Sequence, residues 1–222
     1  MASYVKMPPP PVSVDYQDRV DVALINMACN DRLGCCTISG IDHAWLWQAT
    51  LAGLGYPYPG DPAIQSTYFG LTGGPDSGLQ LSDVVNAAST TGLFGHKLLG
   101  AGAIHAMDVE TLKQTIDTFG VAYCAGVLPA IAEQQFSNGD PWTLEPGNNP
   151  GTGGHCFDFV GYDLNWLYAV TWGAIQKVSY HWWRYYGTMA YALISDFYQQ
   201  AGKGPVANYT AMQNDLHYVT GA

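Results

Sequence analysis

The pattern of apolar and polar positions changes near the middle of the chain. The first half favours helices, and Cys36–Gly53 is apolar on most sides, which predicts a buried central helix. Leu81–Thr91 predicts a second helix closed by Gly92, and Asp108 is the expected N-cap of a third. The stretch 54–79 is rich in glycine and proline, so we expect a loop there with at most one helical turn.

After residue 120 the pattern is that of strands. Short runs of aliphatic and aromatic residues predict strands at Val121–Leu128, His155–Tyr162, Trp166–Trp172, Ile175–Trp183 and Met189–Ile194, and a last helix at about Val206–Tyr218. Helices followed by antiparallel strands indicate the α+β class. We therefore expect an extended proline-rich arm over 1–15, a helical lobe over 16–118, and a β-rich lobe with a C-terminal helix over 119–222.

Charged residues are scarce. Asp, Glu, Lys and Arg make up 12% of the chain, and 18 acidic against 8 basic residues leave a formal net charge of −10. An acidic surface repels phosphate, so no nucleic acid and no membrane is expected as a partner. A largely uncharged surface suits contacts between lobes or subunits, which leaves a homo-oligomer or an assembly partner open.

No targeting or membrane-spanning segment is expected. Pro8–Pro11 interrupt the start before an apolar stretch can form, which argues against a secretory signal, and no run approaches 18 apolar residues. The five cysteines are odd in number and irregularly spaced, which fits a reducing compartment better than a disulfide framework. We expect a cytoplasmic location, with association with a virion as the alternative.

Two segments carry the candidate chemistry. Cys36 opens the predicted central helix, where the positive end of the helix dipole favours a thiolate. His155 follows two glycines, which let the backbone pass close to a facing surface. A cysteine and a later histidine are one order expected for nucleophilic cysteine catalysis. Cys35 competes with Cys36, because adjacent helix positions point about 100° apart and only one of them can face His155.

Together these segments resemble the papain-like cysteine peptidases. Asn30–Ser39 is similar to the family's active-site motif, and His155–Tyr162 is similar to the strand that carries its histidine. Thr171-Trp172-Gly173 resembles the family's Asn-Ser-Trp-Gly element. The resemblance runs in order over about residues 16–195 and extends to small papain-fold proteins of bacteria and their phages. It implies a papain-like fold, with the cysteine-bearing helix central to a helical lobe and an antiparallel β lobe opposite.

The resemblance also implies roles for single residues. Cys36 would be the nucleophile, His155 its base, and Asn30 a donor to the oxyanion beside the Cys36 backbone N–H. Asn30 stands where the family has a longer Gln. The family's histidine-orienting Asn aligns with Val170, which offers no hydrogen bond, so Thr171 is the candidate in its place.

The cleft and its contents follow from the same resemblance. Gly78, Gly154 and Trp172 are the expected substrate-binding positions, and Trp172 is also expected to pack beside the catalytic pair. His43 lies on the Cys36 helix, two turns away, and is expected to be a core or inter-lobe histidine. No metal and no cofactor is expected, because the spacing of cysteines and histidines matches no common zinc site.

The leading expectation is a cysteine hydrolase that cleaves a peptide or other amide bond through an acyl-thioenzyme on Cys36. One alternative is a papain-fold structural protein, of a virion or another assembly, that is weak or inactive as an enzyme; Val170 favours it. The second alternative is a peptidoglycan amide hydrolase of the CHAP or NlpC type, because these enzymes also place Cys before His.

Overall fold

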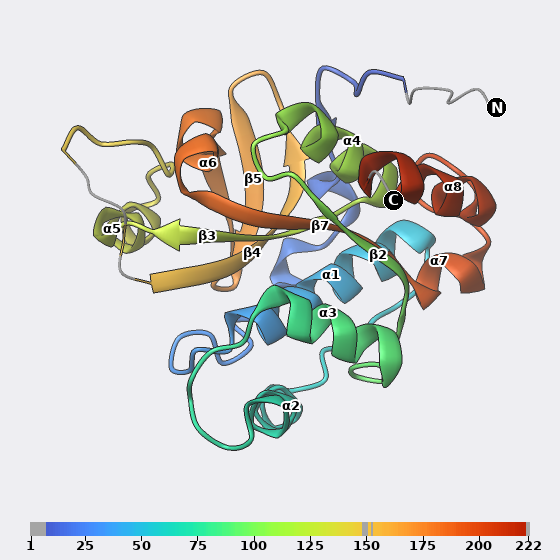
Figure 1. The fold of residues 1–222 in the computed structure, drawn as a ribbon, viewed down its shortest axis with the longest axis horizontal. Helices are drawn as coiled ribbons and strands as arrows, with labels where there is room; N and C mark the ends of the chain where they lie inside the picture. The colour runs from blue at the N-terminus through green and yellow to red at the C-terminus, as the bar shows by residue number, and fades with distance from the viewer. Residues whose placement is uncertain (1–7, 148–150, 152, 221–222) are drawn as a thin grey trace.

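The computed structural model describes residues 8–147, 151 and 153–220 (Figure 1). Residues 1–7 of the expected arm lie outside the described residues. The strands are β1 (Val14–Asp15), β2 (Leu98–Ile104), β3 (Ala122–Leu128), β4 (Gly153–Tyr162), β5 (Trp166–Thr171), β6 (Ala174–Ser179) and β7 (Gly187–Ser195). The helices are α1 (Cys36–Ala52), α2 (Asp61–Thr72), α3 (Leu81–Thr90), α4 (Val109–Phe119), α5 (Ala130–Asn138), α6 (Tyr180–Tyr186), α7 (Asp196–Ala201) and α8 (Tyr209–Thr220), preceded by the short 3-10 turns η1 (Gln17–Arg19) and η2 (Val22–Leu24).

Within these described ranges, seven strands form one antiparallel sheet. Their order is β2-β7-β3-β4-β5-β6, with β1 paired to the end of β4. Figure 1 shows α1, α2 and α3 together below the sheet, and α6 at its upper side. The α+β class expected from the sequence is therefore confirmed, with the helix of Cys36 lying against the sheet.

Local signals account for several elements. Asp108 caps α4 as predicted, because its side chain accepts a hydrogen bond from the Thr111 N–H, and Gly120 ends that helix at φ +77°. The hairpin β4–β5 turns at Asp163, whose carboxylate accepts hydrogen bonds from the N–H groups of Asn165 and Trp166. These elements form where the sequence predicts them because their caps and turns lie within a few residues in the chain.

The loop expected over 54–79, with at most one helical turn, is a wrong prediction, because 12 of its residues form helix α2. Ile64 and Tyr68 lie one turn apart on this helix and are fully buried. Pro62 stands in its first turn and Gly73 follows its last residue, which are the helix positions that favour these residue types. Pro62 and Gly73, two of the residues that suggest a loop, are therefore signals for the two ends of a helix.

Three more elements differ from the sequence pattern. Strand β2 lies in the half where only helices are expected, and it pairs with β7 from the far end of the chain. Helix α5 occupies the connection between β3 and β4, where no helix is expected. The strand expected over Ile175–Trp183 ends at Ser179, because the Ser179 hydroxyl accepts a hydrogen bond from the Trp182 N–H and starts α6.

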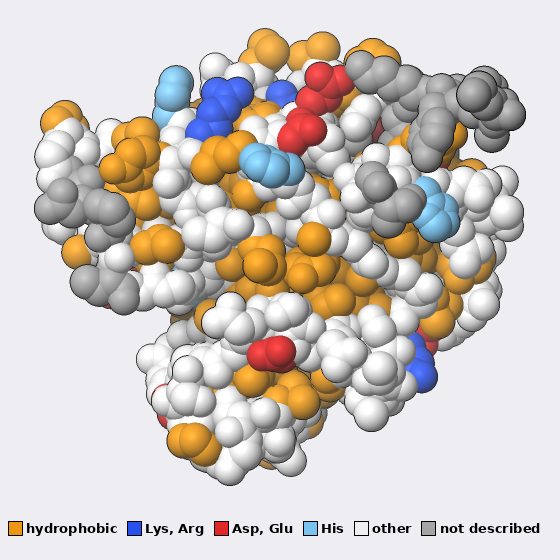
Figure 2. Space-filling model, viewed as in Figure 1, with side chains coloured by type: hydrophobic (Ala, Val, Ile, Leu, Met, Phe, Trp, Pro, Cys, Tyr) orange, Lys and Arg blue, Asp and Glu red, His pale blue; other side chains and the backbone are white. Residues whose placement is uncertain are grey.

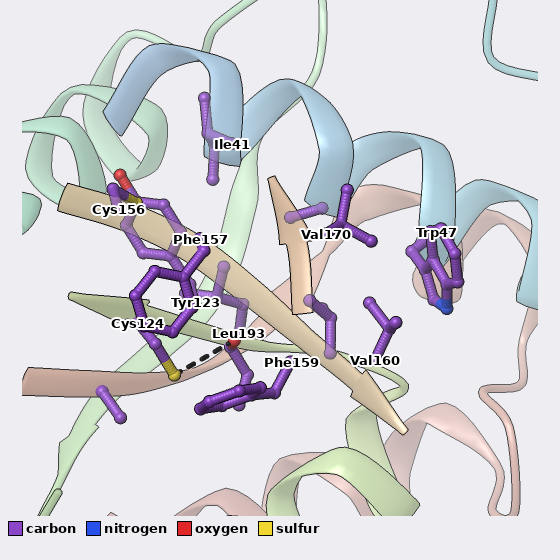
Figure 3. Packing of buried hydrophobic residues seen from close by; sticks show 14 of the residues in the cluster. Ile41, Trp47, Tyr123, Cys124, Cys156, Phe157, Phe159, Val160, Val170 and Leu193 are labelled. Atoms are coloured by element: carbon purple, nitrogen blue, oxygen red, sulfur yellow. Dashed lines mark hydrogen bonds between the residues drawn. The ribbon is translucent and has the colours of Figure 1, made fainter. Parts of the chain in front are cut away.

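Helix α1 packs very closely on β4. A Cβ atom at Gly40 would lie 2.9 Å from the Cys156 sulfur and 2.9 Å from the Tyr123 ring, so no larger residue fits without a shift. Figure 3 shows Ile41 of α1 and Cys156 on one side of β4, and Phe159 on the other side. This packing brings the first residue of α1 beside the first residues of β4.

The surface carries few charges on the face seen in Figure 2, as the low charged fraction leads one to expect. Among the described helices, none combines the length and the apolar character that crossing a bilayer requires.

Candidate active site

Cys36 is the first residue of α1, and its backbone N–H has no carbonyl of its own helix to bind. Burial raises the pKa of the Cys36 thiol, while the N–H groups of Cys156 and Thr37 act in the opposite direction. The neighbouring Cys35 points into the core instead, where its Sγ donates to the Ala28 carbonyl. Of the two adjacent cysteines, Cys36 is therefore the one that faces open space.

His155 lies near the start of β4 and is 6% exposed. Its Nε2 atom and the Thr171 hydroxyl oxygen are 2.6 Å apart and share a hydrogen bond. Burial lowers the pKa of His155 to about 3, because the imidazolium loses its hydration there. The ring is therefore neutral around pH 7, and Nδ1 is the nitrogen left for other partners.

Trp172 covers the histidine. Its ring stacks on the His155 ring with centroids 4.5 Å apart and planes 27° from parallel. Trp172 and Gly173 form the two-residue turn between β5 and β6, with φ of +46° and +73°. A bulky residue rarely adopts positive φ, so this hairpin turn holds Trp172 in a strained conformation beside the histidine. Phe136 and Trp142 pack edge-on against the same indole ring.

Cys36 and His155 line one cleft of about 460 Å³. Figure 2 shows the surface hollowed between the part of the molecule that contains α2 and the part that contains the sheet. The cleft is lined by Gly34, Cys36, Thr37, Ser77, Gly78, Leu79, Gln80, Leu81, Asp83, Ala125, Gly126, Val127, Gly154, His155, Cys156 and Thr188. Between the described side chains of Cys36 and His155 there is no hydrogen bond.

The other predicted site residues fall into two groups. Gly78 and Gly154 line the cleft together with the Cys–His pair. Trp172 and Thr171 contact His155 from behind. Asn30 belongs to neither group: it is half-buried in the turn before α1, its backbone N–H donates to the Met27 carbonyl, and it is not among the residues that line the cleft.

Three buried residues confirm smaller points of the sequence pattern. Val170 is fully buried, so the hydrogen bond to His155 comes from the next residue along the strand. Asp158 points to the opposite face from His155, as strand alternation requires. His43 is a core residue whose Nε2 lies 2.8 Å from the Asn26 carbonyl oxygen.

One side of the cleft, here called the helical wall, is lined by Gly34 and by residues 77–81 and 83. The sequence patterns did not identify the residues that hold this wall together. The Tyr68 hydroxyl donates to Asp76 Oδ1 at 2.6 Å and accepts from the Gly78 N–H at 2.8 Å. Asp76 Oδ1 also accepts from the Gly34 N–H at 2.9 Å. No local motif links a helix tyrosine to a loop carboxylate, so only the turn residues around Gly78 carried a signal.

Comparison with known proteins identifies the fold. No family model matches the sequence, and no curated protein matches it. Among solved structures, xylellain, a cysteine protease from Xylella fastidiosa, superposes with a TM-score of 0.65 at 14% sequence identity, covering 85% of this chain and 90% of that one. A second match is the Carica candamarcensis cysteine protease CMS1MS2 in complex with E-64, with a TM-score of 0.40, 12% identity, and coverage of 82% and 98%. The protein therefore has a papain-like fold.

Proposed function

We propose that this protein is a cysteine hydrolase that cleaves a peptide or other amide bond, with Cys36 as nucleophile and His155 as base. The observation that carries the proposal is the meeting of Cys36, at a helix N-terminus, with His155, from a strand about 120 residues later, in one cleft. The hydrogen bond with Thr171 and the stacking on Trp172 support this proposal, because together they hold the His155 ring in one orientation, which a catalytic imidazole needs.

The proposed reaction starts from a neutral thiol and a neutral imidazole. As Cys36 Sγ attacks the substrate carbonyl carbon, His155 Nδ1 takes the thiol proton. The imidazolium then gives this proton to the leaving amine when the C–N bond breaks, and an acyl-thioester remains on Cys36. Water then attacks the thioester carbonyl carbon while His155 takes one of its protons. The C–S bond breaks, the acyl group leaves as a carboxylic acid, and the proton passes from His155 to Cys36 Sγ, which restores the thiol. The catalytic contacts need to tighten only when substrate is bound.

The proposed oxyanion site begins with the backbone N–H of Cys36, which the helix leaves unpaired. Asn30 is the proposed second donor from the preceding turn. Loss of one such donor costs about 3 kcal/mol of barrier. An Asn30→Ala variant that acylates as fast as the wild type would remove Asn30 from this role.

The test is acylation by an activated ester, because this step needs no knowledge of the natural substrate. p-Nitrophenyl acetate is expected to place one acetyl group on Cys36, detected by peptide mass spectrometry, with a burst of p-nitrophenolate. Cys36→Ala and His155→Ala are each expected to abolish the burst. Cys35→Ser is the matched control, because it alters the adjacent buried cysteine and is expected to leave the burst intact. Absence of an adduct on Cys36, or acylation that does not depend on His155, overturns the proposal.

The strongest competing function is a structural role on a papain-like fold. It is favoured by the missing hydrogen bond between Cys36 and His155, and by a hydroxyl where the family has a carboxamide. A protein that forms no acetyl adduct but still folds and assembles would support this reading. Peptidoglycan amide hydrolysis is separated from peptidase action by digesting purified peptidoglycan and a denatured protein side by side.

A further inference from the structure

One carboxylate oxygen joins the two segments that form the helical wall of the cleft. Asp76 Oδ1 accepts hydrogen bonds from the Gly34 N–H and from the Tyr68 hydroxyl. The Tyr68 hydroxyl oxygen in turn accepts from the Gly78 N–H. Gly34 stands two residues before Cys36, and both Gly34 and Gly78 line the cleft. Two backbone groups of the wall therefore depend on one tyrosine–aspartate pair.

The Tyr68–Asp76 pair is held by close packing around Tyr68. Tyr68 is fully buried on α2, so its hydroxyl has a fixed position. A Cβ atom at Gly34 would lie 3.0 Å from Asp76 Oδ1 and 3.3 Å from the Tyr68 hydroxyl oxygen, which shows how closely the two segments meet. Gly78 has φ +73°, a conformation that other residues rarely adopt. The positions of Gly34 and Gly78 are thus fixed by direct contacts with Asp76 and Tyr68.

The segment that leads to Cys36 has no regular structure of its own to hold it. Ala28 and Cys29 both have positive φ, at 51° and 63°, although neither is glycine. The first residue of helix α2, Asp61, forms an ion pair with Arg32 of this segment. The Tyr68–Asp76 pair anchors it again at Gly34, next to the nucleophile.

From this geometry we infer that Tyr68 and Asp76 are positioning residues, which hold Gly34 and Gly78 so that the turn before Cys36 and the wall of the cleft keep the spacing needed for reaction. This inference rests on the proposed function. Both bonds to the aspartate end on one oxygen, Asp76 Oδ1, which accepts from the Gly34 N–H and from the Tyr68 hydroxyl. The inferred role of Asp76 is therefore that of a hydrogen-bond acceptor, which does not require a negative charge. An amide oxygen at the same place can do the same work.

The decisive experiment compares Asp76→Ala, Asp76→Asn and Tyr68→Phe. Asp76→Ala and Tyr68→Phe are expected to slow single-turnover acylation of Cys36 by about tenfold or more, because small misplacements of reacting groups cost rate steeply. Asp76→Asn retains the acceptor and is expected to stay near the wild-type rate. In amide hydrogen exchange, Gly34 and Gly78 are expected to lose protection in Asp76→Ala, while the amides of α3 keep theirs. Tyr56→Phe is the matched control, because Tyr56 also donates a part-buried hydrogen bond to a carboxylate, that of Asp42, away from this cleft.

Three outcomes overturn the inference. One is unchanged exchange at Gly34 and Gly78 in Asp76→Ala. Another is a rate loss in Asp76→Asn equal to that in Asp76→Ala, which would assign the effect to charge. The third is an equal loss in Tyr56→Phe, which would assign it to general destabilisation. A wild-type protein that does not acylate refutes the proposed function instead, and the exchange measurement still decides whether the pair holds the wall.

Discussion

The Thr171 hydroxyl oxygen lies 2.6 Å from Nε2 of His155, behind a ring that is almost completely buried. A hydroxyl can accept from Nε2–H and can also donate to a bare Nε2. When it accepts, Nδ1 is left as the unprotonated, basic nitrogen of the ring. The role of base that we propose for His155 requires the arrangement in which the Thr171 hydroxyl accepts from Nε2–H.

Removing the Thr171 hydroxyl is expected to damage both stability and reaction. Thr171→Val keeps the shape of the side chain but leaves Nε2 of a buried histidine unpaired, which costs about 1–3 kcal/mol in the free energy of unfolding. Acylation of Cys36 is expected to slow by about tenfold or more, since the His155 ring loses the hydrogen bond that orients it.

Thr171→Ser retains the hydroxyl and is expected to restore the rate, measured as the p-nitrophenolate burst. Thr115→Val is the stability control, because Thr115 is equally buried and its hydroxyl donates to the Thr111 carbonyl far from the cleft. A Thr171→Val protein with wild-type burst kinetics would contradict the assigned contact.

The pH dependence of Cys36 alkylation follows from burial. The pKa of the thiol is raised and the pKa of His155 is lowered to about 3, so both charged forms are disfavoured and no thiolate–imidazolium pair is expected at neutral pH. The rate of alkylation by iodoacetamide is therefore expected to increase by about tenfold per pH unit between about pH 6 and pH 8. Mass spectrometry of the Cys36 peptide gives the rate, and a plateau across this range would reveal a preformed ion pair instead.

Gly40 is expected to be irreplaceable in α1. A methyl group there would meet the Cys156 sulfur and the Tyr123 ring at 2.9 Å, forcing α1 away from β4. Gly40→Ala is expected to lower the free energy of unfolding by about 1–3 kcal/mol and to slow acylation, because Cys36 and His155 move apart. Urea denaturation and the ester burst measure the two effects.

Gly70→Ala is the natural control for this change. Gly70 also lies within a helix, α2, but nothing lies within 4 Å of a Cβ atom built there. Alanine in that position is expected to stabilise the protein by about 0.5–1 kcal/mol, because it is the better helix former. Equal destabilisation by both substitutions would show that the close packing at Gly40 has no special cost.

Asp158 is expected to make the protein less stable as the pH rises. It is fully buried, neither of its carboxylate oxygens has a hydrogen-bond partner, and burial raises its pKa well above 3.8. The folded protein therefore keeps a proton that the unfolded chain releases, and stability falls by about 1.36 kcal/mol per pH unit between the two pKa values.

Asp158→Asn removes this titration. The difference in unfolding free energy between Asp158→Asn and the wild type is expected to grow in favour of the variant from pH 5 to about pH 8, as measured by urea denaturation. The matched control is Asp18→Asn, at an exposed position of η1. A difference for Asp158→Asn that stays constant with pH would show that the carboxylate is ionised in the folded protein.

Prediction from the sequence succeeded where the determining contacts are local. The cap at Asp108, the turn at Asp163 and the buried length of α1 follow from residues within a few positions of one another. It failed for α2 and α6. Glycine and proline occur both in loops and at helix ends, and an aromatic run occurs both in strands and in buried helices. Whether such a run continues a strand or starts a helix depends on one cap, Ser179, and on what the aromatic rings pack against.

The sequence by itself determined the α+β class, the helix that Cys36 begins, and the strand that carries His155. These features depend on the apolar periodicity and the capping residues of short stretches of chain. Only the tertiary structure decided that Thr171 rather than Val170 reaches His155 and that Asn30 stands outside the cleft lining. It also decided that Tyr68 and Asp76 bond to each other and to the N–H groups of Gly78 and Gly34 in the cleft lining. The reason is physical: these relationships join atoms from elements far apart in the chain, and their distances are set by how closely α1, α2 and the sheet pack.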